Sequence, residues 1–449
     1  MRAGLLVVAC AIVFDCHTLH AQSPAPTPPM GWSAWDAYGA GVTEAEFRAN
    51  AAVLANLRRY GWQYAMLDYG WYVQDLSNRQ DPSTYTWDAN GRLVPTPNRF
   101  PSAGQGAGFK PLADWLHARG LKLGIHVMLG VPRQAVTGNL PIEGSQYHAA
   151  DVADTTQTCS WDREFYVAND NPAGQAYYDS LARLYAAWGV DLIKLGCVSD
   201  HPFHASEIRQ ISEAIQKTGR PIVVELSPGP LPADFVPQAG QYAQMWRVAP
   251  EHWDVWATRP GKKGFPVGLR EEFDLLAQTR HDLKEGNWID PDLLADGWLA
   301  PRPAWGESRH SRLNDDEQST EFTLWAFSRS PLIEGANLTR LDPSTRALMT
   351  NRVLLQIDQH AQSSQPINIA LPQLKNVRVW KAQMQDGRVY LAIFNLDDQA
   401  MNVNAAWSEL GLTGGEHAAR DQASDRRLSR SDHIAVSLAA HASAVYEIK

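Results

Sequence analysis

Strand-like and helix-like segments alternate along most of the chain, and this alternation limits the fold more than any other feature of the sequence. Amphipathic stretches such as "GQAYYDSLARLYAAWG" separate short apolar runs, and Thr43 with Glu46 forms a capping-box pattern before the first long stretch. A strand–helix unit repeated about eight times predicts a closed (β/α)8 TIM barrel of parallel strands. The expected strands cover residues 31–35, 64–69, 122–128, 191–197, 221–226, 242–248, a short run at Trp288, and 323–330.

The pattern changes after about residue 359. Short runs such as "VRVWKAQM" and "GRVYLAIFNL" then alternate with turns, which is typical of an antiparallel β-sandwich. We therefore expect a barrel over residues 28–358 and a sandwich over residues 362–449. The 449 residues are enough for both, since a barrel needs about 250.

Residues 1–21 have the features of a secretory signal peptide. Arg2 precedes an apolar stretch over residues 4–14, and Ala21 ends a plausible cleavage site. We expect the protein to be exported, either periplasmic or secreted; a lipoprotein leader anchored at Cys10 is the alternative. No later segment of the sequence is long and apolar enough to span a bilayer.

Four cysteines are present, and Cys10 and Cys16 would leave with the signal peptide. Cys159 and Cys197 remain as an even pair in an oxidising compartment, so we expect a disulfide between them. The alternative is two buried free thiols.

The charge balance narrows the possible partners. A net charge of −9 provides no basic surface, which makes nucleic acid a poor partner. The glycine-rich stretches "GAGVTE" and "GQGAGF" lack the lysine and the strand–turn–helix setting of a phosphate loop. With no close cluster of His, Cys and carboxylates either, we expect no cofactor and no metal.

The C-terminal ends of the expected strands carry an unusual set of polar and aromatic residues. Chemistry collects at these ends in a TIM barrel, and here several carboxylates, two cations and many indoles would share one rim. A glycosidase needs an acid for the leaving oxygen, a second carboxylate and flat apolar faces for sugar rings, so the set predicts an oligosaccharide or glycoside as substrate. The candidates are Glu251 and Asp200 for catalysis, and Trp35, Asp68, Tyr69, Trp71, His126, Lys194, Glu225, Ser227, Arg247 and Asp292 for substrate binding. Asp36, Trp246 and Asp290 lie on the same strand ends.

Each candidate has a simpler interpretation on its own. Asp200 could be the N-cap of the helix that contains "HASEIRQISEAI", and Lys194 could be a surface cation. Arg247 could simply pair with a neighbouring carboxylate. Trp32 and Trp288, like Trp62, are better explained as core residues. Only the joint occurrence of the polar and aromatic candidates on successive strand ends favours a functional site.

Several of these strand ends resemble glycoside hydrolase family 27, the retaining α-galactosidases and α-N-acetylgalactosaminidases. The matching stretches include "TPPMGWSAWDAYG", "YGWQYAMLDYGW", "GLKLGIHVM", "WGVDLIKLGC", "MWRVAPEHWDVW" and "NWIDPDLL". The resemblance covers about three quarters of the chain. It implies a barrel followed by a β-sandwich, an α-linked glycoside as substrate, and a disulfide between Cys159 and Cys197.

The same resemblance exposes departures at the centre of the site. The family places its nucleophilic aspartate two residues after a lysine, but here Gly196 follows Lys194, or the position is deleted if Cys197 is aligned with the family's cysteine. The acid/base aspartate is replaced by Glu251, and one of two sugar-binding acids is replaced by Tyr69. Glycine offers no nucleophile, so double displacement through residue 196 is impossible.

Three functions remain open from the sequence. The first is a divergent glycosidase with Glu251 as general acid and Asp200, Glu225 or Asp292 as the second carboxylate, which would favour inversion. The second is a secreted carbohydrate-binding protein that kept the cleft and lost turnover. The third is a transglycosylase, or an enzyme for α-glucosidic or arabinosidic linkages, that uses the same residues.

Overall fold

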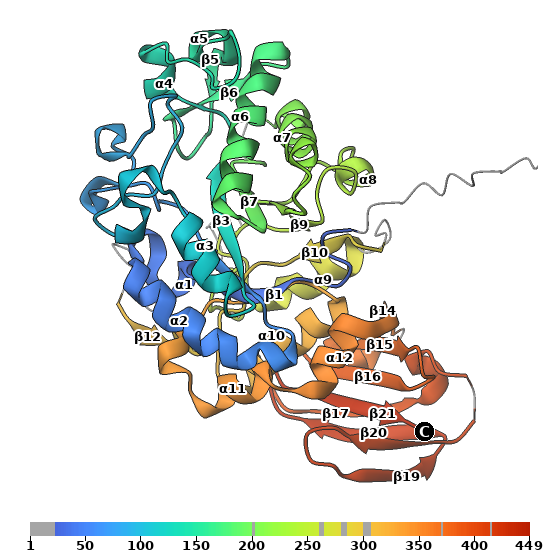
Figure 1. Cartoon of the computed structure of the whole chain (residues 1–449). Coiled ribbons are helices and arrows are strands. Elements are labelled where there is room, and N and C mark those ends of the chain that lie inside the picture. The colour runs from blue at the N-terminus through green and yellow to red at the C-terminus, as the bar shows by residue number, and fades with distance from the viewer. Residues whose placement is uncertain are drawn as a thin grey trace, which may run out of the picture.

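The computed structural model describes residues 23–199, 203–259, 265–279, 285–299, 307–369, 371–413 and 415–449. The chain forms a curled, TIM-like barrel of parallel strands followed by a β-sandwich (Figure 1). Both parts of the fold expected from the sequence are confirmed. Residues 1–21, with Cys10 and Cys16, lie outside the described residues.

Eight parallel strands make up the barrel sheet, in the order β10-β9-β8-β7-β3-β2-β1-β13. A single parallel bridge, Leu294 to Glu334, joins the two ends of this order, and the Leu294 amide donates to the Ile333 carbonyl at 2.9 Å. The strands are β1 (Met30–Ser33), β2 (Tyr64–Leu67), β3 (Lys122–Met128), β7 (Leu192–Gly196), β8 (Val223–Leu226), β9 (Met245–Arg247), β10 (Trp288–Asp290) and β13 (Leu332–Glu334).

Helices cover the outside of this sheet. The capping box expected at Thr43 is confirmed: Thr43 accepts from the Glu46 amide, and Glu46 accepts from the Thr43 amide. The longer helices are α2 (Glu44–Leu57), α3 (Lys110–His117), α6 (Pro172–Trp188), α7 (Ala205–Thr218), α9 (Leu269–Thr279), α10 (Asp315–Ser328), α11 (Pro343–Met349) and α12 (Arg352–His360). Shorter ones are α1 (Trp35–Tyr38), α4 (Arg133–Thr137), α5 (Ala149–Val152) and α8 (Val236–Ala239).

The prediction of a barrel strand over residues 323–330 is wrong. These residues form the end of α10, and the eighth barrel strand is β13, a few residues later. Helix α10 contacts both other helices of the barrel domain and the sandwich strands, so all of its residues from Thr320 to Ser328 are buried. A short run that is apolar all round looks the same in a buried helix as in a buried strand.

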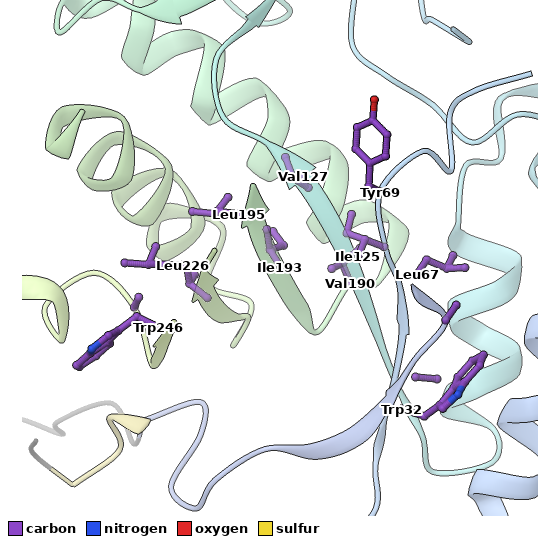
Figure 2. Packing of buried hydrophobic residues seen from close by; sticks show 14 of the residues in the cluster. Trp32, Leu67, Tyr69, Ile125, Val127, Val190, Ile193, Leu195, Leu226 and Trp246 are labelled. Carbon is purple, nitrogen blue, oxygen red and sulfur yellow. The ribbon is translucent and has the colours of Figure 1, made fainter. Parts of the chain in front are cut away.

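Side chains alternate across the barrel strands. In β7, Ile193 and Leu195 join the large apolar cluster shared with the helices, while Leu192 joins a small cluster with Met66 and Met245. Figure 2 shows side chains of the large cluster along neighbouring strands, among them Leu67, Ile125, Val127, Ile193, Leu195 and Leu226. Because the side-chain period of a strand is two, residues 194 and 196 lie on the same inner face as Leu192, nearer the C-terminal end.

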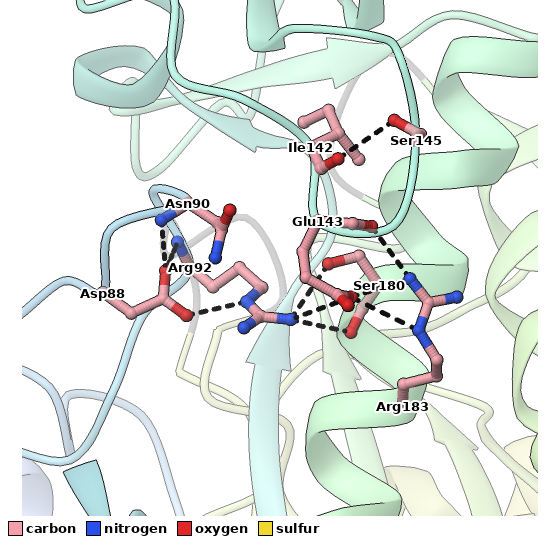
Figure 3. A network of polar contacts seen from close by, with 8 residues as sticks. All are labelled: Asp88, Asn90, Arg92, Ile142, Glu143, Ser145, Ser180 and Arg183. Atoms are coloured by element: carbon pink, nitrogen blue, oxygen red, sulfur yellow. Dashed lines mark hydrogen bonds and ion pairs between the residues drawn. The ribbon is translucent and has the colours of Figure 1, made fainter.

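A polar network ties the long segment after β2 to α6 (Figure 3). Arg92 binds the Asp88 carboxylate at 2.8 Å and donates to the Ser180 hydroxyl at 3.0 Å. Arg183, one turn further along α6, pairs with Glu143 at 2.7 Å. These contacts hold the segments after β2 and β3 against α6.

Small sheets complete the barrel domain. Strands β4 (Val131–Pro132), β5 (Ala153–Thr158) and β6 (Phe165–Ala168) form one antiparallel sheet, and β11 (Trp298–Leu299) pairs with β12 (Arg309–His310). Cys159 directly follows β5 and forms a disulfide with Cys197, directly after β7. The expected disulfide is therefore confirmed, and it joins the small sheet to the strand that carries Lys194.

The C-terminal part is an antiparallel sandwich with its own apolar core, which includes Leu391, Ile393 and Trp407. One sheet has the order β14-β15-β16-β21-β18-β19, and β17 pairs with β20. The strands are β14 (Ala361–Ile367), β15 (Val377–Met384), β16 (Val389–Asn395), β17 (Met401–Ala406), β18 (His417–Asp421), β19 (Arg427–Ser431), β20 (His433–Leu438) and β21 (Ser443–Ile448). Among the helices in the described ranges, none has the length and apolar character needed to cross a membrane.

Candidate active site

A cavity of about 410 Å³ lies at the C-terminal ends of the barrel strands. Most of the residues singled out from the sequence line it. These are Trp35, Asp68, Tyr69, His126, Lys194, Ser227, Arg247, Glu251 and Asp292, and Gly196 lies among them. The barrel therefore brings together, at one end, residues that are up to about 250 positions apart in the chain, as Trp35 and Asp292 are.

Two predicted binding residues do not line the cavity. Trp71 is buried in the core, where its indole donates to the His126 carbonyl at 2.7 Å and its ring meets Phe109 and Trp188 edge-on. Glu225 is also buried, on the inner face of β8 beside Lys194. It lies one layer deeper in the barrel than Ser227, which is two residues further along and does line the cavity.

Asp200 lies outside the described residues. The alternative interpretation of Asp200 as a helix N-cap is wrong, because α7 begins at Ala205 with His204 at its N-cap. The three tryptophans assigned to the core, Trp32, Trp62 and Trp288, are all buried, as expected.

Lys194 and Asp68 form a buried ion pair on the cavity wall. The Lys194 ammonium lies 3.1 Å from Asp68 Oδ2 and 3.9 Å from Glu225 Oε1. Burial alone would lower the pKa of Lys194, but Asp68 and Glu225 raise it above its ordinary value. Burial likewise favours a neutral Asp68, yet Lys194 and His126 bring its net pKa below the usual range. Both groups are therefore charged, so they offer a cation and an anion to sugar hydroxyls.

Arg247 and Asp292 form a second buried pair. The Arg247 guanidinium lies 2.7 Å from Asp292 Oδ2, and Asp292 Oδ2 also accepts from the His252 amide at 3.0 Å. Asp292 has a backbone φ of +99°, a strained conformation for a residue with a side chain. The Trp325 indole, which donates to the Asp292 carbonyl at 3.0 Å, helps to hold this conformation. Such strain at a cavity wall indicates that the carboxylate direction is specified by the surrounding fold.

Glu251 follows β9 and lies on the cavity wall. Burial raises the pKa of its carboxyl, Asp292 raises it further, and a hydrogen bond from Trp253 lowers it. That hydrogen bond joins the Trp253 indole to Glu251 Oε2 at 3.2 Å. A buried carboxyl with a raised pKa keeps its proton at higher pH, which is the state that a general acid requires.

Tyr69 occupies part of the cavity beside Asp68. Its hydroxyl donates to Asp162 Oδ2 at 2.9 Å, and its ring meets Trp161 at 5.2 Å and Trp35 at 6.5 Å between ring centres. Burial raises the pKa of Asp162 to about 6, although the Tyr69 hydrogen bond opposes this. The Tyr69 ring is therefore held by its hydroxyl, which bonds to Asp162, and by its contacts with two indoles. It reduces the space in the cavity that is available to a ligand.

Sequence reasoning missed several residues of the cavity wall. Asp36, to which the sequence assigns no role, lines the cavity. Its buried Oδ2 has no hydrogen-bond partner among the described residues, and burial raises its pKa well above the usual range. Trp161 lies two residues after Cys159, and Trp253 two residues after Glu251, so nearness to assigned residues was the available signal. Within the described ranges, no group of three or more His, Cys, Asp or Glu side chains is arranged to hold a metal ion.

A parallel barrel whose strand ends present carboxylates, two cations and indoles around one cavity defines a glycosidase-type protein. The comparisons specify it further. The family model described as "Alpha galactosidase A" matches residues 27–166 and 161–360, and the one described as "Alpha galactosidase C-terminal beta sandwich domain" matches residues 375–448. The chain therefore belongs to glycoside hydrolase family 27, and it is a glycosidase by its family and its relatives.

Similar proteins include enzymes for two kinds of sugar. The solved structure of a β-L-arabinopyranosidase of this family from Geobacillus stearothermophilus is 36% identical, with a TM-score of 0.86 over 95% of this chain and 97% of that one. A variant of that enzyme with an aspartate replaced by alanine, in complex with arabinose, is also 36% identical, with a TM-score of 0.87 over 96% and 99% of the two chains. A curated alpha-galactosidase from Oryza sativa subsp. japonica is 25% identical over 426 residues, which are 94% of this chain and 84% of that one.

Proposed function

We propose that the protein is an exported hydrolase of β-L-arabinopyranosides, with Glu251 as its general acid. β-L-Arabinopyranose has the ring and hydroxyl configuration of α-D-galactopyranose but lacks the exocyclic hydroxymethyl group. The carrying observation is Tyr69, a locked aromatic ring beside Asp68 where the family has a second acid. A ring at this position leaves less room for a hydroxymethyl group and offers it no carboxylate. The likeness to an arabinopyranosidase at 36% identity supports the same choice.

The charged pairs would bind the sugar hydroxyls. Asp68 and Asp292 would accept hydrogen bonds, and Lys194 and Arg247 would donate them, all from side chains that are already fixed by their ion pairs. The indole of Trp35 would offer a flat apolar face to the ring. Ser227 and His126 complete the set of proposed contacts.

The reaction we propose is a single displacement by water. Glu251 would protonate the leaving oxygen while a second carboxylate activates water on the opposite face of the ring, which inverts the anomeric centre. Asp292 and Asp200 remain the candidates for this second role. Glu225 is dropped from it because it does not line the cavity.

The alternative is a non-catalytic sugar-binding protein, and Gly196 is the observation that favours it. A transglycosylase on the same residues would differ only in replacing water by a second sugar. Export itself is proposed from residues 1–21 and agrees with the disulfide, since disulfides persist in oxidising compartments.

One experiment separates these functions. The mature protein is incubated with 4-nitrophenyl β-L-arabinopyranoside, α-D-galactopyranoside and α-N-acetylgalactosaminide, and the first anomer released is identified by proton NMR. We expect the arabinopyranoside to be cleaved fastest, with the inverted α-anomer appearing first and no cleavage by Glu251→Gln. A faster galactoside would overturn the choice of sugar, a retained anomer would overturn single displacement, and a condensed product would indicate transglycosylation. Binding of arabinose without any cleavage would establish the alternative.

A further inference from the structure

A second cavity, of about 300 Å³, adjoins the candidate active site. Trp253 and Phe265 line both cavities, so the two are contiguous. Phe265 is 42% exposed, the largest exposure of any large apolar side chain in the described residues. An exposed aromatic ring between two adjoining cavities is well suited to stack against a sugar.

The position of the second cavity relative to Glu251 indicates what it would hold. A general acid gives its proton to the oxygen between the cleaved sugar and the leaving group, so the leaving group extends from the side of the acid. Trp253, which is hydrogen-bonded to Glu251 at 3.2 Å, forms part of the wall of the second cavity. The second cavity therefore lies where the leaving-group sugar would be.

The charges on this wall are mostly positive. Its ionic side chains are Arg259, Arg309, Arg312 and Asp254. Asp254 is buried and is held by Arg309 through two contacts, at 3.0 and 2.7 Å, and by Arg312 at 3.4 Å. One carboxylate among three arginines leaves an excess of two positive charges.

Two of the arginines are accessible to a ligand. Arg259 is exposed, and no carboxylate of the described residues forms an ion pair with it. The Arg312 side chain is 58% exposed and makes only the longer contact with Asp254. Arginine presents a planar group of N–H donors that matches a carboxylate or a sulfate, so both side chains are suited to bind an oxyanion.

We propose that the second cavity is a binding site for an anionic leaving-group sugar, one that carries a carboxylate or a sulfate ester. This proposal rests on the proposed function, because it assigns the leaving group of the same reaction. It gives the protein a substrate class: a neutral pyranose linked to an acidic sugar, such as the glycosyl end of an acidic polysaccharide.

Binding of small glycosides tests the proposal without requiring turnover. Methyl β-D-glucuronide and methyl β-D-glucoside 6-sulfate are titrated against the protein by NMR at low ionic strength, with methyl β-D-glucoside as the neutral reference. We expect at least one anionic glycoside to bind on the order of tenfold more tightly than the neutral one, by a charge-assisted hydrogen bond. The comparison of the two anionic glycosides shows whether the site prefers a carboxylate or a sulfate. Added salt should reduce the preference for an anionic over a neutral glycoside.

Variants then locate the site. Arg259→Gln and Arg312→Gln should each remove most of the preference for the anion, whereas Arg427→Gln, at an exposed arginine of β19 in the sandwich, should leave it unchanged. Equal binding of charged and neutral glycosides, or a preference that survives Arg259→Gln, would overturn the proposal. Failure of the proposed function is separate: the preference would then persist in a protein that cleaves none of the aryl glycosides.

Discussion

The imidazole of His126 fills the space into which a side chain at Gly196 would project. A Cβ atom on Gly196 would lie 2.4 Å from His126 Nε2 and 2.5 Å from its Cε1, far inside contact distance. The register of β3 and β7 explains the proximity, since it pairs His126 with Lys194 and Met128 with Gly196. Burial also lowers the pKa of His126 to about 4, so the ring at this point is neutral near pH 7. The space beside Gly196 is therefore already occupied.

Restoring the aspartate alone should damage the site. Gly196→Asp would force His126 to move, at a cost of about 1–3 kcal/mol in the free energy of unfolding, because the wall is already filled. Gly196→Asp with His126→Ala should recover much of that stability. Denaturant unfolding of wild type, both single variants and the double variant gives the coupling energy directly. A Gly196→Asp protein as stable as wild type would contradict the packing argument.

Gly196→Asp and the double variant of Gly196→Asp with His126→Ala also report on catalysis. If the site has decayed from a retaining enzyme, the double variant should gain retaining activity on a glycoside that the wild type binds. If the site works by inversion, Gly196→Asp should reduce activity, because the His126 ring that it displaces would intrude on the cavity in which water attacks. NMR of the first product distinguishes the two results.

Glu251→Gln should abolish turnover while leaving sugar affinity nearly unchanged, because only proton donation is lost. In the wild type, kcat/KM should fall as pH rises through the raised pKa of Glu251, where the general acid loses its proton. A pH–rate profile checks this. Glu251→Asp, which keeps an acid, is the control and should retain part of that profile. Equal activity of Glu251→Gln and wild type would show that another group donates the proton.

Asp68→Ala should weaken both the sugar complex and the fold. Loss of a charge-assisted hydrogen bond should weaken sugar binding by about 1.5–3 kcal/mol. A buried Lys194 left with only its longer contact to Glu225, at 3.9 Å, should cost at most about 3–5 kcal/mol of stability. Asp68→Ala with Lys194→Met removes both charges, so it should recover stability but not affinity. Calorimetric binding and denaturant unfolding measure the two effects. Full affinity in Asp68→Ala would remove Asp68 from the sugar site.

The pH dependence of this pair follows from its shifted pKa values. The folded pKa of Asp68 lies below its unfolded value of about 3.9, so its contribution is complete above that value and is lost as pH falls through the folded pKa. The folded pKa of Lys194 lies above its unfolded value of about 10.4, so its contribution is complete below that pH and is lost at higher pH. At acid pH, the free energy of unfolding should therefore depend less steeply on pH in the variant with both Asp68→Ala and Lys194→Met than in the wild type.

The sequence was sufficient to predict the rim because a parallel barrel brings all its strand ends to one face. Lys194, Arg247 and Asp292 could be placed together by this rule alone. The rule does not say how far a side chain reaches or which way a residue beyond a strand turns. Glu225 points inward but lies below the cavity, 3.9 Å from the Lys194 ammonium. Trp71, after the end of β2, turns into the core, where its indole donates to the His126 carbonyl.

The contents of the loops were harder to predict. Trp161 and the second cavity lie on segments with no strand period, so pattern reasoning gave no direction for their side chains. The end of α10 was mispredicted as a strand for another reason. Because this helix is buried on nearly every side, its sequence lacks the alternation of apolar and polar residues that distinguishes a helix from a strand. Gly196 lines the cavity, as its place at a strand end predicted, but its neighbour His126 could be identified only from the register of β3 and β7.

Glu272 on α9 should make the protein less stable as pH rises. It is fully buried, neither carboxyl oxygen has a hydrogen-bond partner among the described residues, and burial raises its pKa to about 8, against an opposing effect of His252. The unfolded chain loses this proton near pH 4.3, so between about 4.3 and 8 the folded state holds a proton that the unfolded state has released. This group should reduce the free energy of unfolding by about 1.4 kcal/mol per pH unit over that range, with no further loss above it.

Glu272→Gln should flatten this pH dependence of the free energy of unfolding, whereas Asp274→Asn, at an exposed position of the same helix, should not. Denaturant unfolding at pH 5, 6, 7 and 8 measures how steeply the free energy of unfolding changes with pH in each protein. Equal slopes in wild type and Glu272→Gln would show that Glu272 is ionised in the folded protein.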